Sequence, residues 1–235
     1  MTGLRSDTAR PLVVCDCDEV LLQMVAHFRD WLAEAHDVEF RLDGASFAEA
    51  MRYQDGGRLE PDEVWRLLGA FFDGEMHRQH PFDGAVEAIN TLSEHADVAI
   101  LTNLVDERRE ARARQLAGHG IDAPVYTNQG PKGPALARII AEYRPSRTVF
   151  IDDLAQHHRS VKELLPEVTT LHLCGEAALS PHIACAHQAG HADARIDTWD
   201  EALPWLLDWL GVAEPALDRG AAGVHGAAQV RGDRR

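Results

Sequence analysis

The chain has 235 residues, of which 45% are hydrophobic and 26% are charged, and its formal net charge is -15. A chain of this length and composition can bury one sizeable core and carry an inserted subdomain, which excludes a disordered or fibrous protein. The strong negative charge argues against a nucleic acid or an anionic membrane as a partner, because both attract basic surfaces.

The sequence shows no sign of membrane insertion or of a disulfide framework. No segment reaches the roughly 20 apolar residues of a membrane helix, and the N-terminal segment lacks the apolar stretch of a signal peptide. The four cysteines, Cys15, Cys17, Cys174 and Cys185, are too few and too unevenly spaced for a disulfide framework. We therefore expect a soluble, cytoplasmic protein, whose oligomeric state the sequence does not predict.

Short apolar runs rich in β-branched residues predict strands that are buried on both faces. Clear runs occupy residues 12–15, 98–101 and 148–151, and weaker candidates lie near Val125 and at 168–173.

Helical patterns follow these strands. One helix is predicted from Asp106 to Gly118 or Gly120, another from Leu136 to Tyr143, and a last one over residues 200–210, ended by Gly211. The alternation of strands and helices predicts an α/β fold, with a three-layer Rossmann-like parallel sheet covered by helices on both faces. This core is expected to comprise residues 10–20 and 81–211.

Residues 21–80 interrupt the alternation because their patterns are helical throughout. Ser46 is a predicted N-cap, and Pro61 suits the first turn of a further helix. A helical insertion directly after the first strand is expected to form a small cap subdomain over the sheet. Residues 212–235 are rich in Gly, Ala and Arg without periodicity, which predicts a disordered tail.

Polar side chains follow each of the three clear strands. The carboxyl ends of parallel strands meet at one edge of the sheet, and open α/β sheets bind ligands there, so we expect these side chains to converge. They are Asp16 and Asp18 after the first strand, Thr102 and Asn103 after the second, and Asp152 and Asp153 after the third.

Four carboxylates at one edge would repel one another unless some stay protonated or a cation lies among them. Oxygen ligands of this kind favour Mg²⁺, which keeps positions open for a phosphate. Lys132 is one of only two lysines and lies at the start of a predicted helix, where the helix dipole disfavours a cation. Its ammonium group would stabilise the charge of a phosphoryl group.

The ordered set of residues 16–20 (Asp-Cys-Asp-Glu-Val), Thr102, Lys132 and residues 152–153 (Asp-Asp) resembles the four motifs of the haloacid dehalogenase superfamily. The resemblance covers the sheet domain, and the insertion lies where that superfamily places a helical cap. The resemblance implies that Asp16 is a nucleophile forming an aspartyl-phosphate and that Asp18 is the general acid and base.

The resemblance also implies the binding groups. Thr102, Asn103 and Lys132 would hold the phosphoryl oxygens. Mg²⁺ would be held by Asp16, the backbone carbonyl of Asp18, and one or both of Asp152 and Asp153.

Asp18 favours phosphate-ester hydrolysis, because members that cleave carbon–halogen bonds lack this aspartate whereas phosphatases and phosphomutases keep it. The expected protein is a Mg²⁺-dependent phosphatase, a phosphoric monoester hydrolase acting on a small phosphorylated metabolite. A phosphomutase, or a catalytically silent phosphate-binding or regulatory protein of the same fold, stays an alternative. A two-component receiver domain has similar residues in a different order, and ATPase-type members carry Lys-Thr-Gly after the nucleophile, which is absent here.

Several further residues have less specific signals. Glu19 is expected to point away from the face shared by Asp16 and Asp18, and His157 and His158 could line the site or simply occupy a first helical turn. A zinc site or a histidine-rich loop could explain Cys174, His182, Cys185, His187 and His191, although their spacing matches no standard zinc motif. Residues of the insertion that could contact a leaving group are Arg52, Tyr53, Arg58, Trp65, Arg66, His77 and Arg78.

Overall fold

The computed structural model describes residues 9–41 and 47–212, and the statements below concern these residues. The predicted N-cap at Ser46 and the predicted tail from residue 213 onward lie outside them. None of the described helices is long and apolar enough to cross a membrane. All four cysteines are free thiols, as their spacing predicts.

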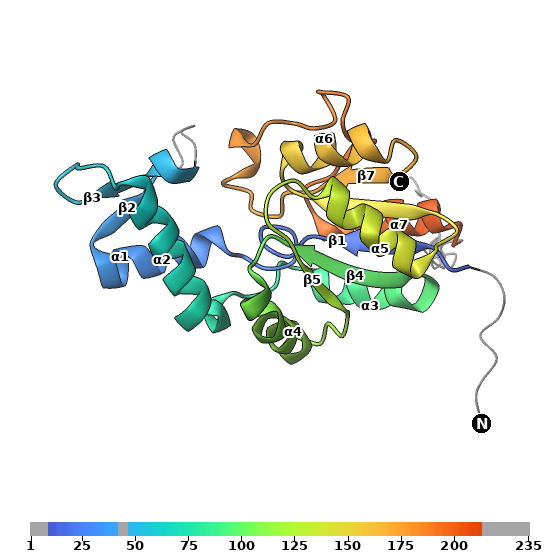
Figure 1. The fold of residues 1–235 in the computed structure, drawn as a ribbon, viewed down its shortest axis with the longest axis horizontal. Coiled ribbons are helices and arrows are strands. Elements are labelled where there is room, and N and C mark those ends of the chain that lie inside the picture. Colours follow the sequence, from blue (N-terminus) through green and yellow to red (C-terminus); the bar gives the residue numbers. More distant parts are fainter. Residues whose placement is uncertain (1–8, 42–46, 213–235) are drawn as a thin grey trace, which may run out of the picture.

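A six-stranded parallel sheet forms the centre of the molecule (Figure 1), in the order β5-β4-β1-β6-β7-β8. The predicted strands are all present, and the α/β fold class is confirmed. The edge strand β8 was not predicted, because two half-buried residues carry no pattern. The strands are β1 (Leu12–Cys15), β4 (Asp97–Thr102), β5 (Val125–Thr127), β6 (Thr148–Asp152), β7 (Thr169–His172) and β8 (Ala194–Arg195).

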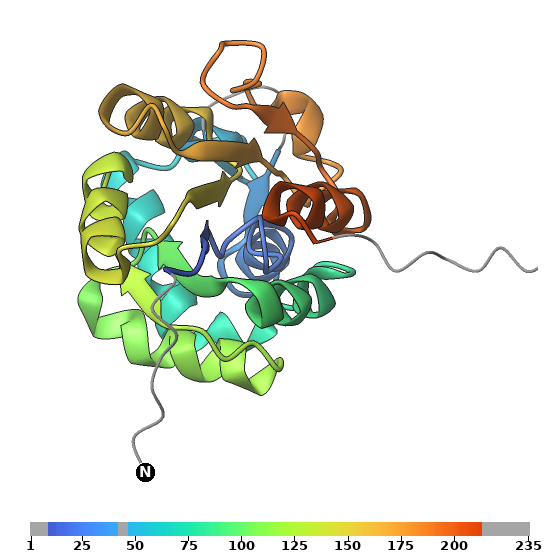
Figure 2. The same cartoon turned by 90° about the vertical axis from the view of Figure 1, so that its right-hand side faces the viewer.

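Helices cover both faces of this sheet, as Figure 2 shows along the strands. Alternate residues of β1 point to opposite faces. Val13 and Cys15 pack with α3 and α7, whereas Leu12 and Val14 pack with α5 and α6. The helices are α3 (Ala85–His95), α4 (Arg109–Gly118, after the short turn η3, Asp106–Arg108), α5 (Gly133–Tyr143), α6 (Ala155–Leu164) and α7 (Trp199–Leu210).

A second group of elements, here called the outer lobe, stands beside the sheet (Figure 1). It has its own apolar core, which includes Phe28, Leu32, Leu67 and Phe71. The outer lobe consists of α1 (Val25–His36), β2 (Val38–Phe40), η1 (Phe47–Ala50), β3 (Met51–Tyr53) and α2 (Pro61–Gly74), followed by the turn η2 (Met76–Arg78).

The prediction that the insertion contains only helices is wrong. β2 and β3 pair antiparallel, with Val38 opposite Tyr53 and Phe40 opposite Met51. Each strand has only three residues, and β2 alone alternates buried and exposed side chains, so the sequence pattern is too short to distinguish from one helical turn.

The chain enters and leaves the outer lobe through two paired segments. Leu22 and Pro81 form an antiparallel bridge. The Gln23 amide donates to the His80 carbonyl at 2.9 Å, and the Phe82 amide donates to the Leu21 carbonyl at 2.9 Å. These two segments therefore form a short hydrogen-bonded neck between the sheet domain and the outer lobe.

Candidate active site

The residues predicted at the strand ends converge at one edge of the sheet. The Asp16 amide donates to the Ile151 carbonyl at 2.9 Å, which fixes the end of β1 against β6. Thr102 and Asp152, the last residues of β4 and β6, are fully buried. A single cavity is lined by Asp16, Asp18, Asn103, Lys132 and Asp153.

Lys132 lies at the N-cap of α5 and is fully buried. Its Nζ is 2.7 Å from Asp16 Oδ1 and 2.7 Å from Asp152 Oδ2. Burial alone would lower the pKa of Lys132, but Asp152 and Asp16 outweigh it and hold that pKa above its usual value. A Cβ atom at Gly133 would lie 2.4 Å from the Ser160 carbonyl oxygen, so glycine is required for α5 to begin this close to α6.

The three buried carboxyl groups have different protonation tendencies. Burial raises the pKa of Asp16 to about 7, although Lys132 opposes the shift. Burial also acts on Asp152, but Lys132 and the neighbouring His157 outweigh it, so the pKa of Asp152 lies below its usual value. Burial and the nearby Asp152 and Asp16 carboxylates raise the pKa of Asp153 well above its usual value.

These carboxyl groups form a candidate metal site. Asp16, Asp152 and Asp153 each place a carboxylate oxygen within 4.8 Å of the others, and all three are buried. Asp153 is 5% exposed, and the nearby Asp152 and Asp16 carboxylates help to raise its pKa. A cluster of buried carboxyl groups that repel one another fits a site where a hard divalent cation supplies the missing positive charge.

Asp18 is held by residues from three other segments. The fully buried Arg112 of α4 donates to both Asp18 carboxylate oxygens, at 2.9 and 3.1 Å. Gln79 Nε2 donates to Asp18 Oδ1 at 2.7 Å, and Thr102 Oγ1 donates to Asp18 Oδ2 at 3.4 Å. The side chain of Asp18 is 17% exposed and still borders the cavity.

Solved structures of other proteins share this arrangement of elements over nearly their full length. A hydrolase from Deinococcus radiodurans, with bound phosphate and sodium, has a TM-score of 0.61 and 19% identity over 89% of this chain and 100% of its own. A predicted phosphoglycolate phosphatase from Haemophilus somnus has a TM-score of 0.59 and 13% identity over 86% of this chain and 100% of its own. A protein from Thermotoga maritima assigned as a β-phosphoglucomutase has a TM-score of 0.57 and 15% identity over 84% of this chain and 99% of its own.

The chain has the haloacid dehalogenase-like fold. The resemblance predicted from the four motifs is thereby confirmed at the level of the fold. No family model and no curated protein matches the sequence.

Sequence reasoning did not find Arg112 or Gln79. Arg112 lies in an arginine-rich helix without a clear apolar stripe, and its partner Asp18 is distant in the chain. On this haloacid dehalogenase-like fold, Arg112 also contacts the outer lobe, since its guanidinium lies 5.6 Å from the centroid of the Phe72 ring. Arg108, on the preceding turn, forms an ion pair with Asp73 at 2.7 Å. One segment thus contacts both Asp18 and α2.

The Arg112→Met variant should lower the free energy of unfolding by about 2 kcal/mol. The change removes both guanidinium hydrogen bonds to Asp18. Breaking a fully buried ion pair costs about 3–5 kcal/mol, and we expect a smaller decrease because solvent reaches part of the Asp18 carboxylate. Urea denaturation measures the free energy of unfolding of the variant. Arg114→Met is the matched control, because Arg114 is 73% exposed on the same helix. Equal stability of the two variants would contradict this role of Arg112.

Glu19 behaves differently from its expectation. Its backbone is left-handed, with φ of 63°. Its Oε1 accepts hydrogen bonds from the amides of Met24 at 2.9 Å and Val25 at 2.5 Å, at the start of α1. The Glu19 side chain therefore contacts the start of α1, but Glu19 also borders the cavity of Asp16 and Asp18, from which the sequence predicted that it would point away.

Only some of the remaining candidate residues lie at the cavity. His157 lines the cavity, while His158 is buried, with its Nε2 2.9 Å from the Asp152 carbonyl oxygen. The cysteine and histidine residues considered for zinc form no metal-binding group within the described residues. Of the insertion residues proposed to contact a leaving group, Trp65 alone lines this cavity in the described part of the chain.

Proposed function

We propose that the protein is a Mg²⁺-dependent phosphatase of the haloacid dehalogenase type, acting on a small phosphorylated metabolite. The observation that carries this proposal is the position of the Asp16 carboxylate. It borders the cavity, lies 2.7 Å from the Nζ of buried Lys132, and belongs to the three-carboxylate cluster.

In the proposed reaction, an Asp16 carboxylate oxygen attacks phosphorus and the bond from phosphorus to the ester oxygen breaks. Asp18 donates a proton to the leaving oxygen. Asp18 then accepts a proton from a water molecule that attacks the aspartyl-phosphate, which releases inorganic phosphate and restores Asp16. Lys132 stays charged throughout and stabilises the negative charge on the Asp16 side of the phosphoryl group.

Asp16, Asp152 and Asp153 would hold Mg²⁺, together with the backbone of Asp18. Bound there, the metal supplies positive charge that allows carboxylates and a phosphate dianion to occupy one site. Thr102 is the last residue of β4 and Asn103 follows it. Both are proposed to bind phosphoryl oxygens. The outer lobe is proposed to act as the cap that covers the substrate.

Release of inorganic phosphate from a panel of phosphorylated metabolites tests this function. Phosphate should appear with Mg²⁺ present, stop when a chelator is added, and resume when Mg²⁺ is restored. Turnover unchanged by chelation would contradict the proposed metal. No turnover on any ester would favour a catalytically silent phosphate-binding protein.

A phosphomutase is the second candidate, favoured by the structural similarity to the Thermotoga maritima protein assigned as a β-phosphoglucomutase. In that case the phosphoryl group on Asp16 would pass to a hydroxyl group of a sugar phosphate rather than to water. Isomer formation without phosphate release would identify this activity.

Mg²⁺ should stabilise the protein more at about pH 8 than at about pH 5. The folded-state pKa values of Asp16 (about 7) and Glu19 (about 8) lie above their usual 3.8 and 4.5. As pH rises through this interval, the unfolded chain releases these protons before the folded protein does, so the metal-free fold loses stability. A bound cation favours the ionised carboxylates and offsets that loss.

Melting temperatures with Mg²⁺ and with chelator, measured across this pH range, check this prediction. The buried His157 and His158 titrate under both conditions, so their contribution is largely removed when the two series are subtracted. The Asp153→Asn variant should show a smaller Mg²⁺ effect. A Mg²⁺ effect that is the same at every pH would contradict the linkage.

A further inference from the structure

A cavity of about 510 Å³ separates the catalytic residues from the outer lobe. Asp16, Asp18 and Lys132 form one part of its wall. Most of the remaining wall is apolar, and much of it comes from the outer lobe. Its apolar lining includes Phe47, Trp65, Leu68 and Phe72 from the outer lobe and Leu154 and Leu179 from the sheet domain.

Helix α2 presents apolar side chains on two faces. Val64, Leu67 and Phe71 are buried in the core of the outer lobe. Trp65, Leu68 and Phe72 follow a helical spacing of three and four residues and line the cavity instead. Phe72 also belongs to the core of the lobe and Leu68 packs against that core, whereas Trp65 is exposed. Trp65 and the cavity-facing parts of Leu68 and Phe72 are therefore available to a ligand.

Trp65 is the clearest sign of an apolar ligand. It is 59% exposed, and Leu164 is the only other large hydrophobic side chain in the described part of the chain with comparable exposure. The Trp65 ring stacks on Phe47, with centroids 6.4 Å apart and planes 24° apart. A stacked aromatic pair at a cavity wall favours an apolar group that can lie against it.

The charges around the cavity disfavour a second anionic group on the substrate. Lys132 is the one lysine or arginine among the described lining residues, and it already contacts Asp16 and Asp152. Four acids line the same cavity, namely Asp16, Asp18, Glu19 and Asp153. Arg112 is fully buried and paired with Asp18, and residues 42–46 contain no lysine or arginine.

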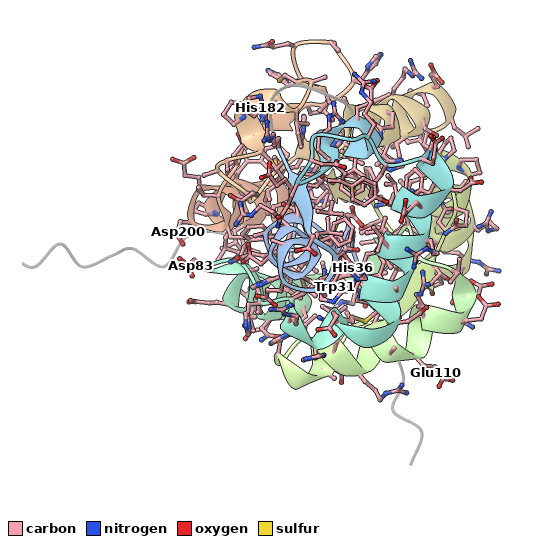
Figure 3. The ribbon with its side chains drawn as sticks, turned by 90° about the vertical axis from the view of Figure 1, so that its left-hand side faces the viewer. Trp31, His36, Asp83, Glu110, His182 and Asp200 are labelled. Atoms are coloured by element: carbon pink, nitrogen blue, oxygen red, sulfur yellow. The ribbon has the colours of Figure 1, made fainter. Side chains whose placement is uncertain are left out.

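Two histidines at the cavity do not change the excess of acidic over basic side chains around it. Burial lowers the pKa of His157, so its ring stays neutral near pH 7. His182 lies on the segment after β7, as Figure 3 shows in a view toward the outer lobe. It is exposed at the cavity, and its charge would be screened by solvent.

We propose that the organic group of the substrate is apolar and carries no second anionic group, so that the substrate class is a monophosphate ester of an apolar, aromatic or long aliphatic alcohol. This inference rests on the proposed phosphatase function, because it assumes that the phosphate lies at Asp16 and Lys132. The apolar group then occupies the space between α2 and the segment around Leu179. A carboxylate or a second phosphate at that position would lose its hydration without gaining a cation.

Two esters of primary alcohols test the proposal: phenylethyl phosphate and carboxyethyl phosphate. Both leaving groups are primary alkoxides, so a difference in kcat/KM reports contacts with the organic group. We expect phenylethyl phosphate to be preferred by at least about tenfold, in the range that one apolar pocket contributes to specificity. Equal values, or a preference for carboxyethyl phosphate, would overturn the inference while leaving the phosphatase function intact.

Variants of Leu68 connect this preference to the cavity. Leu68→Lys should lower kcat/KM for phenylethyl phosphate and raise the relative activity on carboxyethyl phosphate. Leu164→Lys is the matched control, because Leu164 is 51% exposed at the end of α6 and does not line the cavity. The same change in preference in both variants would overturn the assignment of Leu68.

Binding of non-reacting analogues separates the two proposals. Phenylpropylphosphonate and carboxypropylphosphonate cannot be hydrolysed, and calorimetry measures their affinity in the presence of Mg²⁺. If neither these two esters nor any member of the metabolite panel is hydrolysed, the phosphatase function fails. Tighter binding of the phenyl compound would then still support the apolar cavity, whereas equal binding or no binding would overturn it as well.

Discussion

The Asp16→Asn variant is expected to lose phosphatase activity by at least about a thousandfold, because an amide cannot form the aspartyl-phosphate. The side chain keeps nearly the same shape. Burial raises the pKa of Asp16 to about 7, so the folded metal-free protein already holds this group partly as a neutral acid near neutral pH. We therefore expect the variant to fold with stability close to that of the unmodified protein.

Phosphate release and urea denaturation together check this result. Asp97→Asn is the matched control, because Asp97 begins β4 at the opposite end of the sheet and is 42% exposed. That variant should keep full activity. An Asp16→Asn protein that retains activity after the same purification would exclude Asp16 as the nucleophile and remove the basis of the proposed function.

The Lys132→Met variant is expected to lose both activity and stability. Lys132 is fully buried between Asp16 and Asp152, so its removal leaves two carboxyl groups without their cation. Breaking a buried ion pair from one side costs about 3–5 kcal/mol. Lys132→Arg should not restore function, because a guanidinium group is larger than an ammonium group and needs a different set of acceptors.

The chain offers a matched control for this change, since Lys162 is its other lysine. Lys162 pairs with Asp193 at 2.7 Å near the surface, where such a pair contributes at most about 1 kcal/mol. Lys162→Met should therefore keep activity. If Lys132→Met unfolds at the same urea concentration as Lys162→Met, the buried network does not stabilise the fold as inferred.

The main features of the site could be predicted because they follow from local rules. Asp16 and Asp152 lie at the ends of strands whose apolar runs are plain in the sequence, and the parallel sheet brings such ends together. Lys132 could be identified because this chain has few lysines and because Lys132 lies at the start of a helix. Each of these patterns can be recognised within a single segment of the sequence, and the order of the segments then predicts that they meet in the fold.

Other features could not be predicted because they depend on contacts between distant segments. Arg112 and Gln79 differ from other arginines and glutamines of the chain only through their contact with Asp18. The position of Glu19 depends on a left-handed backbone conformation, which is uncommon for a residue other than glycine. Trp65 was considered among seven residues of the insertion, and the packing of α2 distinguishes it from the other six.

The neck of paired segments at Leu22 and Pro81 has a consequence for how such a protein can diverge. The chain leaves the sheet domain and returns to it at adjacent, hydrogen-bonded positions. An insertion whose two ends lie together can change in length or be exchanged without altering the strand register. New substrate ranges can therefore arise by replacing one contiguous stretch of the gene, while the residues proposed to transfer the phosphoryl group are inherited unchanged.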